Sequence, residues 1–133
     1  MINVNGTGIY IAYPRSENVT QVTGGPGSGV NCRYTKVGTT ADSFYASGRA
    51  YRRAFENQVK FMPLVEIPAR HLPYTEEKIL AAVAERFPRV GATPNWFDTQ
   101  DRASIISLIY NLLSPAANES FHEPGVALQR SGL

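Results

Sequence analysis

The sequence predicts an α+β domain in which a small three-stranded antiparallel sheet is flanked by helices, and three observations support this prediction. The chain has 133 residues, 43% of them hydrophobic and 18% charged, which are the size and composition of one globular domain. Strand-like and helix-like segments follow one another in the order β-β-α-β-α-α. No apolar run approaches the roughly 20 residues that a membrane-spanning helix needs.

The first two strands are predicted on either side of a glycine-rich segment. In Thr7 to Tyr13 apolar side chains alternate, so that Ile9 and Ile11 share one face and Tyr10 lies on the other. Arg33 to Thr39 is the second strand, most simply paired antiparallel with the first. Between them, residues 16–31 are rich in glycine and polar residues, a composition that predicts a mobile loop.

A helix and a third strand follow. Asp42 or Ser43 is predicted to cap a helix that runs to about Asn57, because these side chains accept hydrogen bonds from the first free backbone amides. Val59 to Ile67 is predicted as the third strand. Pro63 within it indicates a sheet edge or a bulge, since proline cannot donate to a strand ladder.

Two further helices complete the predicted domain. Thr75 is a candidate N-cap for a helix that ends near Phe87, and its apolar residues recur at helical spacing. The segment Asp98 to Asp101 resembles a cap for the last helix. The domain is therefore expected over residues 1–115. Residues 116–133 show no periodicity and are expected to form a flexible C-terminal tail.

Charge and cysteine content restrict the class of protein only loosely. The net charge of +2 imposes no overall field, so a nucleic-acid partner has to be inferred from local groups of cations. Cys32 is the only cysteine, which excludes an internal disulfide and a cysteine-based zinc site. The first residues lack the features of a signal peptide. These observations predict a cytoplasmic protein that has no membrane partner.

Two short segments, Gly8-Ile9-Tyr10 and Lys36-Val37-Gly38, carry a resemblance to a known family. Together with an arginine on the next helix and a glutamate on the following one, they resemble the GIY-YIG nuclease superfamily. The resemblance covers about Thr7 to Leu113. It is closest to the small phage and bacterial branch whose second motif carries lysine and whose late motif ends in Trp-Phe, here Asn95-Trp96-Phe97.

The resemblance implies a fold, an activity and a set of site residues. It implies a GIY-YIG-like domain that hydrolyses DNA phosphodiester bonds with one Mg²⁺ or Mn²⁺ ion. Tyr10 would act as the base that generates the attacking water, or would help to activate it. Arg49 would bind the scissile phosphate, and a glutamate on the following helix would hold the metal.

The residues of the two strand motifs agree with part of this assignment. Tyr10 lies opposite Ile9 and Ile11, so its hydroxyl need not be buried in the core. A free phenol has a pKa near 10 and is a poor base at neutral pH, but an ammonium group favours the phenolate. Lys36 on the adjacent strand is expected to provide one. The alternative is that Tyr10 is an ordinary strand tyrosine, a residue type enriched in sheets.

The basic residues form a candidate DNA-backbone surface. Arg49, Arg52 and Arg53 fall on one stretch of the predicted helix, and Arg33 lies shortly before it. The planar guanidinium group can donate two hydrogen bonds to phosphate oxygens. Asn95 is a further candidate that would brace the site, although a turn residue explains it equally well. A solvated basic face is the alternative for the arginines.

The metal ligand is where the sequence departs from the family pattern. The expected position of the glutamate is occupied by Leu80, and leucine cannot bind a divalent ion. Glu76 lies one turn earlier on the same helical face, and Glu77 follows it. A ligand shifted by one turn and a lost ligand both remain open, because Glu76 also suits the first turn of a helix. One carboxylate would suffice for magnesium.

Two functions are therefore predicted as alternatives. The first is a divalent-metal-dependent endonuclease that acts on DNA through Tyr10, Lys36, Arg49 and Glu76, with weak sequence preference. The second is a catalytically inactive GIY-YIG-like module that binds nucleic acid or protein. A protein partner or a homodimer is possible under either alternative, and fold similarity alone does not decide between them.

Overall fold

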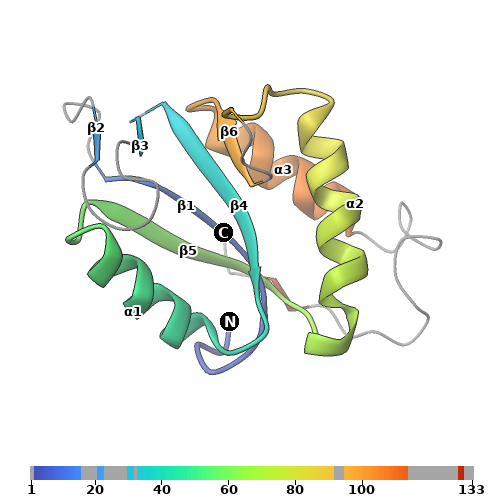
Figure 1. Ribbon diagram of the computed structural model, residues 1–133. Coiled ribbons are helices and arrows are strands. Elements are labelled where there is room, and N and C mark those ends of the chain that lie inside the picture. Colours follow the sequence, from blue (N-terminus) through green and yellow to red (C-terminus); the bar gives the residue numbers. More distant parts are fainter. Residues whose placement is uncertain are drawn as a thin grey trace.

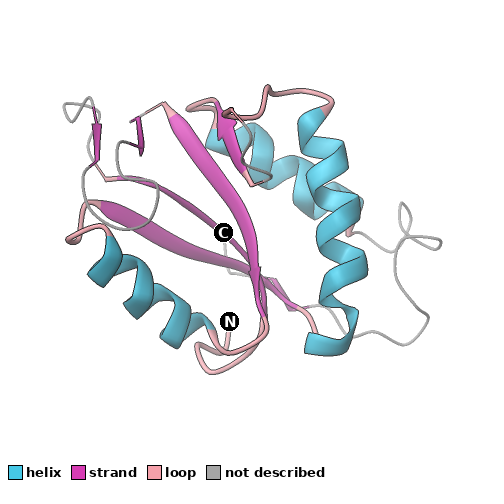
Figure 2. Cartoon of the chain, in the orientation of Figure 1, coloured by secondary structure: helices cyan, strands magenta, loops and turns pink. Residues whose placement is uncertain are grey.

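The computed structural model describes residues 2–15, 21–22, 30–31, 33–91, 95–113 and 129–130. Its long elements form an α+β domain in which helices lie on both sides of one antiparallel sheet (Figures 1 and 2). Along the chain the elements are β1 (Gly8–Pro14), β2 (Gln21–Val22), β3 (Val30–Asn31), β4 (Tyr34–Thr40), α1 (Phe44–Ala54), β5 (Val59–Glu66), η1 (Ala69–His71), α2 (Leu72–Ala84), β6 (Trp96–Asp98), α3 (Arg102–Leu112) and β7 (Gln129–Arg130).

The main sheet has the strand order β6-β4-β1-β5, and β7 extends its outer edge beside β5. The α+β class is confirmed, but the prediction of three strands is wrong. The additional strand β6 comes from the Trp-Phe segment and pairs with β4, with Trp96 opposite Lys36. A segment of three residues is too short to show the alternation of side chains that identifies a strand in a sequence. An extended backbone was therefore predictable for this segment, but its pairing with β4 was not.

The central strand β1 pairs with β4 on one side and with β5 on the other. Its antiparallel pairing with β4 across the glycine-rich segment is confirmed. In the pairing with β5 the register shifts between Ile9 and Tyr10, and Pro63 lies opposite Tyr10. Both alternatives for Pro63 therefore hold: the register shift lies beside it, and among the described residues β7 pairs with β5 only at Val65 and Glu66, so β5 is an edge strand at Pro63.

The sheet separates two groups of buried side chains. The larger core lies on the face of Ile9, Ile11 and Val37, and the apolar residues of α2 and α3 pack against it. The smaller core lies on the opposite face and combines Tyr10 and Ala12 with the aromatic residues of α1. The predicted alternation along β1 is confirmed. Tyr10, however, belongs to a second core rather than to an open face.

The helix boundaries follow the predicted caps at α1 and α3 but not at α2. Ser43 caps α1, and its side chain accepts a hydrogen bond from the amide of Ala46. The predicted N-cap Thr75 is wrong, because α2 begins at Leu72 and Thr75 is buried inside the helix. Pro73 lies in the first turn, where a missing N–H costs no helical hydrogen bond, so the helix can start earlier.

Parts of the predicted loop and tail take up strand structure. Within residues 16–31, Gln21–Val22 pairs with Val30–Asn31 as a separate two-stranded sheet. Within 116–133, Gln129–Arg130 pairs with β5. The remainder of both predictions lies outside the described residues. In the part of the chain that the structure describes, no helix has the length and the apolar character needed to cross a lipid bilayer.

Candidate functional site

Two tyrosine hydroxyls meet on the α1 side of the sheet. The hydroxyl of Tyr10 lies 2.9 Å from that of Tyr51 on α1, and the ring of Tyr10 also packs against Phe61 with centroids 4.4 Å apart. Only 5% of Tyr10 is exposed, which corrects the expectation that its hydroxyl is free of the core. Burial raises the pKa of both phenols, so neither is a phenolate at neutral pH.

Lys36 lies on the same face of the sheet as Tyr10. It is the cross-strand partner of Ala12, and its Nζ atom lies 4.9 Å from the centre of the Tyr51 ring. Partial burial lowers the pKa of Lys36, and the negative charge of Glu76 opposes that shift. Lys36 was expected to favour the phenolate of Tyr10. Instead, burial is the main influence and raises the pKa of Tyr10, and Glu76 raises it further.

Glu76 reaches the second motif from α2. The hydroxyl of Thr39 donates a hydrogen bond to Oε2 of Glu76 over 2.8 Å, which ties the end of β4 to the first half of α2. Leu80, one turn later, is buried in the larger core. The structure thus brings Glu76 to Lys36 and Tyr10, close enough to influence the pKa of both groups. Glu77 is exposed, and its position is rotated by about 100° around the helix.

The donor set for a metal ion consists of one carboxylate. Within the described residues no group of three or more His, Cys, Asp and Glu side chains is suitable for a metal. Magnesium commonly binds through one or two carboxylates, with waters and substrate phosphate as its other ligands. Glu76 fits an ion held in that way. Its carboxylate already accepts the hydrogen bond from Thr39, which would orient it.

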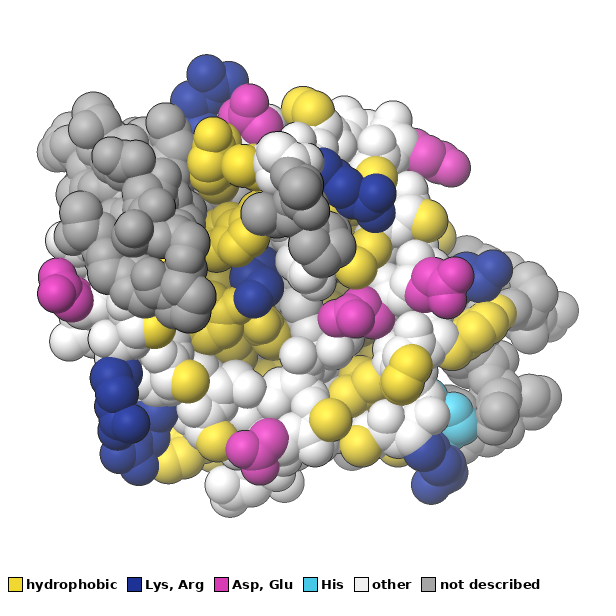
Figure 3. All heavy atoms as spheres, viewed as in Figure 1, with side chains coloured by type: hydrophobic (Ala, Val, Ile, Leu, Met, Phe, Trp, Pro, Cys, Tyr) yellow, Lys and Arg dark blue, Asp and Glu magenta, His cyan; other side chains and the backbone are white. Residues whose placement is uncertain are grey.

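An open pocket of about 280 Å³ lies beside Lys36. Its remaining lining residues come from α1 and β6: Ala50, Tyr51, Ala54, Phe55 and Trp96. In the space-filling view, hydrophobic side chains surround a basic group on the face between α1 and α2, and acidic side chains lie next to them (Figure 3). The pocket therefore combines aromatic walls with one ammonium group.

The three arginines of α1 lie in a different place. Arg49, Arg52 and Arg53 line a groove of about 360 Å³ together with Tyr45 and Asn57. Basic side chains are seen over α1 in Figure 3. Successive helical residues are rotated by about 100°, so this groove and the pocket lined by Ala50 and Ala54 occupy two flanks of the helix. Arg49 therefore shares a surface with its neighbouring arginines, while Tyr51 is the α1 residue that reaches Tyr10.

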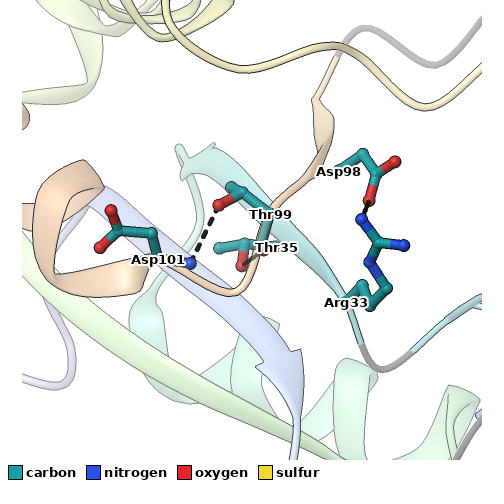
Figure 4. A network of polar contacts seen from close by, with 5 residues as sticks. All are labelled: Arg33, Thr35, Asp98, Thr99 and Asp101. Carbon is teal, nitrogen blue, oxygen red and sulfur yellow. Dashed lines mark hydrogen bonds and ion pairs between the residues drawn. The ribbon is translucent and has the colours of Figure 1, made fainter.

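Arg33 belongs to a network at the far end of β4 (Figure 4). Its Nη2 atom lies 3.6 Å from Oδ1 of Asp98, while 66% of its side chain stays exposed. The backbone amide of Asp101 donates to Oγ1 of Thr99, and the Thr35 hydroxyl donates to the Thr99 carbonyl. This network joins β4, β6 and the start of α3, so Arg33 has a structural partner in addition to an exposed surface.

Asn95 braces the edge of β4 from the segment before β6. Its side-chain amide donates to the carbonyl of Val37 over 3.2 Å, and its own carbonyl accepts from the amide of Val37 over 3.0 Å. Val37 follows Lys36, so these two bonds hold the backbone beside the pocket. The structure thus gives Asn95 a bracing position next to Lys36.

Tyr51 and Phe55 are the functional candidates that sequence reasoning missed. Tyr51 stands seven positions after the buried Phe44 and four before Phe55, a spacing that places all three on the inner side of one helix. That spacing was a usable signal. Trp96 of the late Trp-Phe motif is only half-buried and lines the pocket.

Comparisons of the chain with protein-family profiles, with curated proteins and with solved structures gave no match.

Proposed function

We propose that this domain is a divalent-metal-dependent endonuclease that hydrolyses DNA phosphodiester bonds, as a cytoplasmic member of the phage and bacterial branch of the GIY-YIG superfamily. The observation that carries the proposal is the convergence of Lys36 and Glu76 at the Tyr10–Tyr51 pair. These groups come from four elements, β1, β4, α1 and α2. A basic, an acidic and a hydroxylic group close together suit proton transfer and the binding of an anionic substrate.

The geometry changes the role of Tyr10 within this proposal. A buried phenol whose pKa is raised does not take a proton from water at neutral pH, so Tyr10 orients Tyr51 instead. Lys36 is the better candidate base, because burial lowers its pKa below the ordinary value for lysine. Its Nζ atom, once neutral, accepts the proton of the attacking water. The water oxygen bonds to phosphorus as the P–O bond of the leaving group breaks, and solvent protonates that oxygen.

Glu76 is assigned to the metal. A divalent ion bound there would polarise the phosphate and stabilise charge on the leaving oxygen. Glu76 would hold the ion with its carboxylate oriented by the hydrogen bond from Thr39, and its negative charge opposes the lowering of the Lys36 pKa by burial. The arginine groove on the other flank of α1 binds the DNA backbone away from the reacting phosphate and positions the substrate.

A cleavage assay with matched variants tests the proposal. Plasmid and single-stranded DNA are incubated with the protein, with and without Mg²⁺ or Mn²⁺. Glu76→Gln and Lys36→Met should each reduce the cleavage rate by about 10²-fold or more, the scale of a lost acid–base group. Glu77→Gln, a change at the next residue on the exposed face, should cleave like the wild type. Equal cleavage by the wild type and Glu76→Gln would overturn the proposal.

A second candidate function is a module that binds nucleic acid without cleaving it, with a protein partner or a second copy of the chain supplying what the site lacks. The position of Arg49 favours this candidate, because no arginine of α1 lines the pocket beside Lys36. Salt-sensitive DNA binding without metal-dependent cleavage by the wild type would select it over the nuclease.

A further inference from the structure

We propose that the pocket beside Lys36 receives one unpaired nucleobase, so that the domain prefers single-stranded or locally unpaired nucleic acid. The inference deepens the proposed function and rests on it in one respect, that the ligand is a nucleic acid. It does not require cleavage. Lys36 and Tyr51 belong to both sites, whereas Ala50, Ala54, Phe55 and Trp96 have no part in the proton transfer or the metal site described above.

The walls of the pocket are planar aromatic groups at stacking distances. Tyr51 and Phe55 lie with ring centres 5.9 Å apart and planes inclined by 21°, and Trp96 meets Phe55 edge-on at 6.4 Å. Trp96 and Tyr51 are only half-buried, so they face an opening rather than a closed core. Partly open aromatic rings of this kind are what single-stranded nucleic-acid sites use to stack bases.

The size and the polarity of the pocket also suit one base. Its volume of about 280 Å³ lies at the lower end of the range for small-molecule sites. Ala50 and Ala54 form the α1 side of the pocket, and their short side chains leave the space open. No carboxylate appears among its described lining residues.

Lys36 supplies the charge that fits a nucleotide. Its ammonium group lies at the pocket against the Tyr51 ring, where it can contact a base carbonyl or the adjoining phosphate. An apolar protein segment would bury this cation further while offering it neither an anion nor a hydrogen-bond acceptor, which is unfavourable. The single ammonium group among aromatic walls therefore favours a nucleotide over a hydrophobic peptide.

The intrinsic fluorescence of Trp96 tests the inference directly, because Trp96 is the only tryptophan in the chain. The probes are a short oligothymidylate and a strand of equal length in which every nucleotide is abasic. Stacking of a base should quench Trp96 on titration with the oligothymidylate. The abasic strand should not quench it and should bind about tenfold more weakly or worse, the loss expected when one stacked base is removed.

A substitution that fills the pocket tests the inference, and the same substitution on another helix is its control. Ala50→Leu places a larger side chain in the pocket at an exposed helical position, and it should abolish the quenching and the preference for the base-bearing strand. Ala81→Leu makes the same change at an exposed position of α2 and should bind like the wild type. Thermal denaturation of both variants checks that each is folded.

The outcomes separate this inference from the proposed nuclease. Equal affinity for the two strands, or quenching that survives Ala50→Leu, would overturn the base pocket even if metal-dependent cleavage through Glu76 is found. Base-dependent quenching in a protein that never cleaves would support the pocket while the nuclease fails. Binding of an apolar peptide that quenches Trp96, with no quenching by oligothymidylate, would assign the pocket to a protein ligand and overturn the inference.

Discussion

Tyr10 packs directly on Gly38: a Cβ atom at position 38 would lie 2.6 Å from the hydroxyl oxygen of Tyr10 and 2.7 Å from its Cζ atom. The two residues are cross-strand partners in β1 and β4. The glycine of the second motif is therefore explained by the tyrosine of the first, because any larger residue would displace the ring. The two motifs form one packing unit, whether or not the site is catalytic.

Gly38→Ala should destabilise the fold by about 1–3 kcal/mol, the usual cost of an added methyl group in a packed site. The reason is the overlap with the Tyr10 ring. Urea denaturation of the wild type and the variant measures the change in the free energy of unfolding. In a Tyr10→Ala background the ring is gone, so the same substitution should cost much less. An equal cost in both backgrounds would contradict the packing argument.

The features of the fold that could be predicted from the sequence are those with a local pattern. The alternation of β1 was predicted correctly because a period of two is visible over seven residues. The cap of α1 was narrowed to Asp42 or Ser43 because its signal is local, and the structure selects Ser43. The start of α2 was missed because Thr75 resembles a cap, while Pro73 also permits an earlier start. Strand β6 is defined by its pairing with β4, which is a long-range contact. A segment of three residues carries no pattern from which that pairing could be predicted.

The site was predictable only in part for a related reason. Lys36 and Glu76 were proposed from the resemblance of the two motifs and the following helix, and the structure places the charge of Glu76 near enough to influence the pKa of Lys36. Tyr51 was missed because its contact with Tyr10 spans 41 residues. Arg49 was assigned from the family resemblance. Which side chains of α1 face the sheet depends instead on their angular position around the helix relative to the buried Phe44.

The hydrogen bond between Tyr10 and Tyr51 should be measurable by a double-mutant cycle. Tyr10→Phe and Tyr51→Phe keep both rings and remove one hydroxyl each, and each single change leaves the other hydroxyl buried without its partner. Each should cost about 1–3 kcal/mol. The double variant should cost clearly less than the sum, because no hydroxyl is then left unsatisfied. Additive costs would contradict a direct hydrogen bond.

The same pair should make the protein sensitive to alkaline pH. Burial raises the pKa of Tyr10 and Tyr51 above the ordinary value of 10.0, so the unfolded chain loses these protons first. Their contribution to stability is fully present below pH 10 and is lost as the pH rises above it. Tyr51→Phe should lessen this loss when urea denaturation is followed upward from pH 9. Tyr45→Phe, at an exposed position of the same helix, should retain the wild-type loss.

Lys36→Met should reveal the cost of burying the ammonium group. The folded pKa of Lys36 lies below its ordinary value of 10.5 because burial penalises the charge. The variant should therefore be more stable than the wild type at pH 7. The wild type should regain stability relative to the variant as the pH rises from the folded pKa towards 10.5, since the unfolded state then binds more protons.

Urea denaturation at pH 7 and at pH 10 measures that difference, and the tyrosines cancel because both proteins contain them. Lys60→Met, at an exposed position of β5, is the control and should show no such dependence on pH. If the variant were less stable than the wild type at pH 7, the attraction of Lys36 to Glu76 would outweigh the cost of its burial. That result would contradict the larger influence of burial on the pKa of Lys36.

The arginine groove should control the affinity for nucleic acid independently of its sequence. Arg49→Gln combined with Arg53→Gln removes two cations from the groove, and DNA binding should weaken to a similar degree for all sequences. The slope of log K against log [salt] should fall in magnitude by about 1.8 for duplex DNA or about 1.4 for a single strand, if both side chains contact phosphates. Fluorescence anisotropy over a range of salt concentrations measures this slope. Arg86→Gln combined with Arg89→Gln, at exposed positions just after α2, removes the same charge elsewhere. If that control changed the slope as much, the effect would reflect net charge and not the groove.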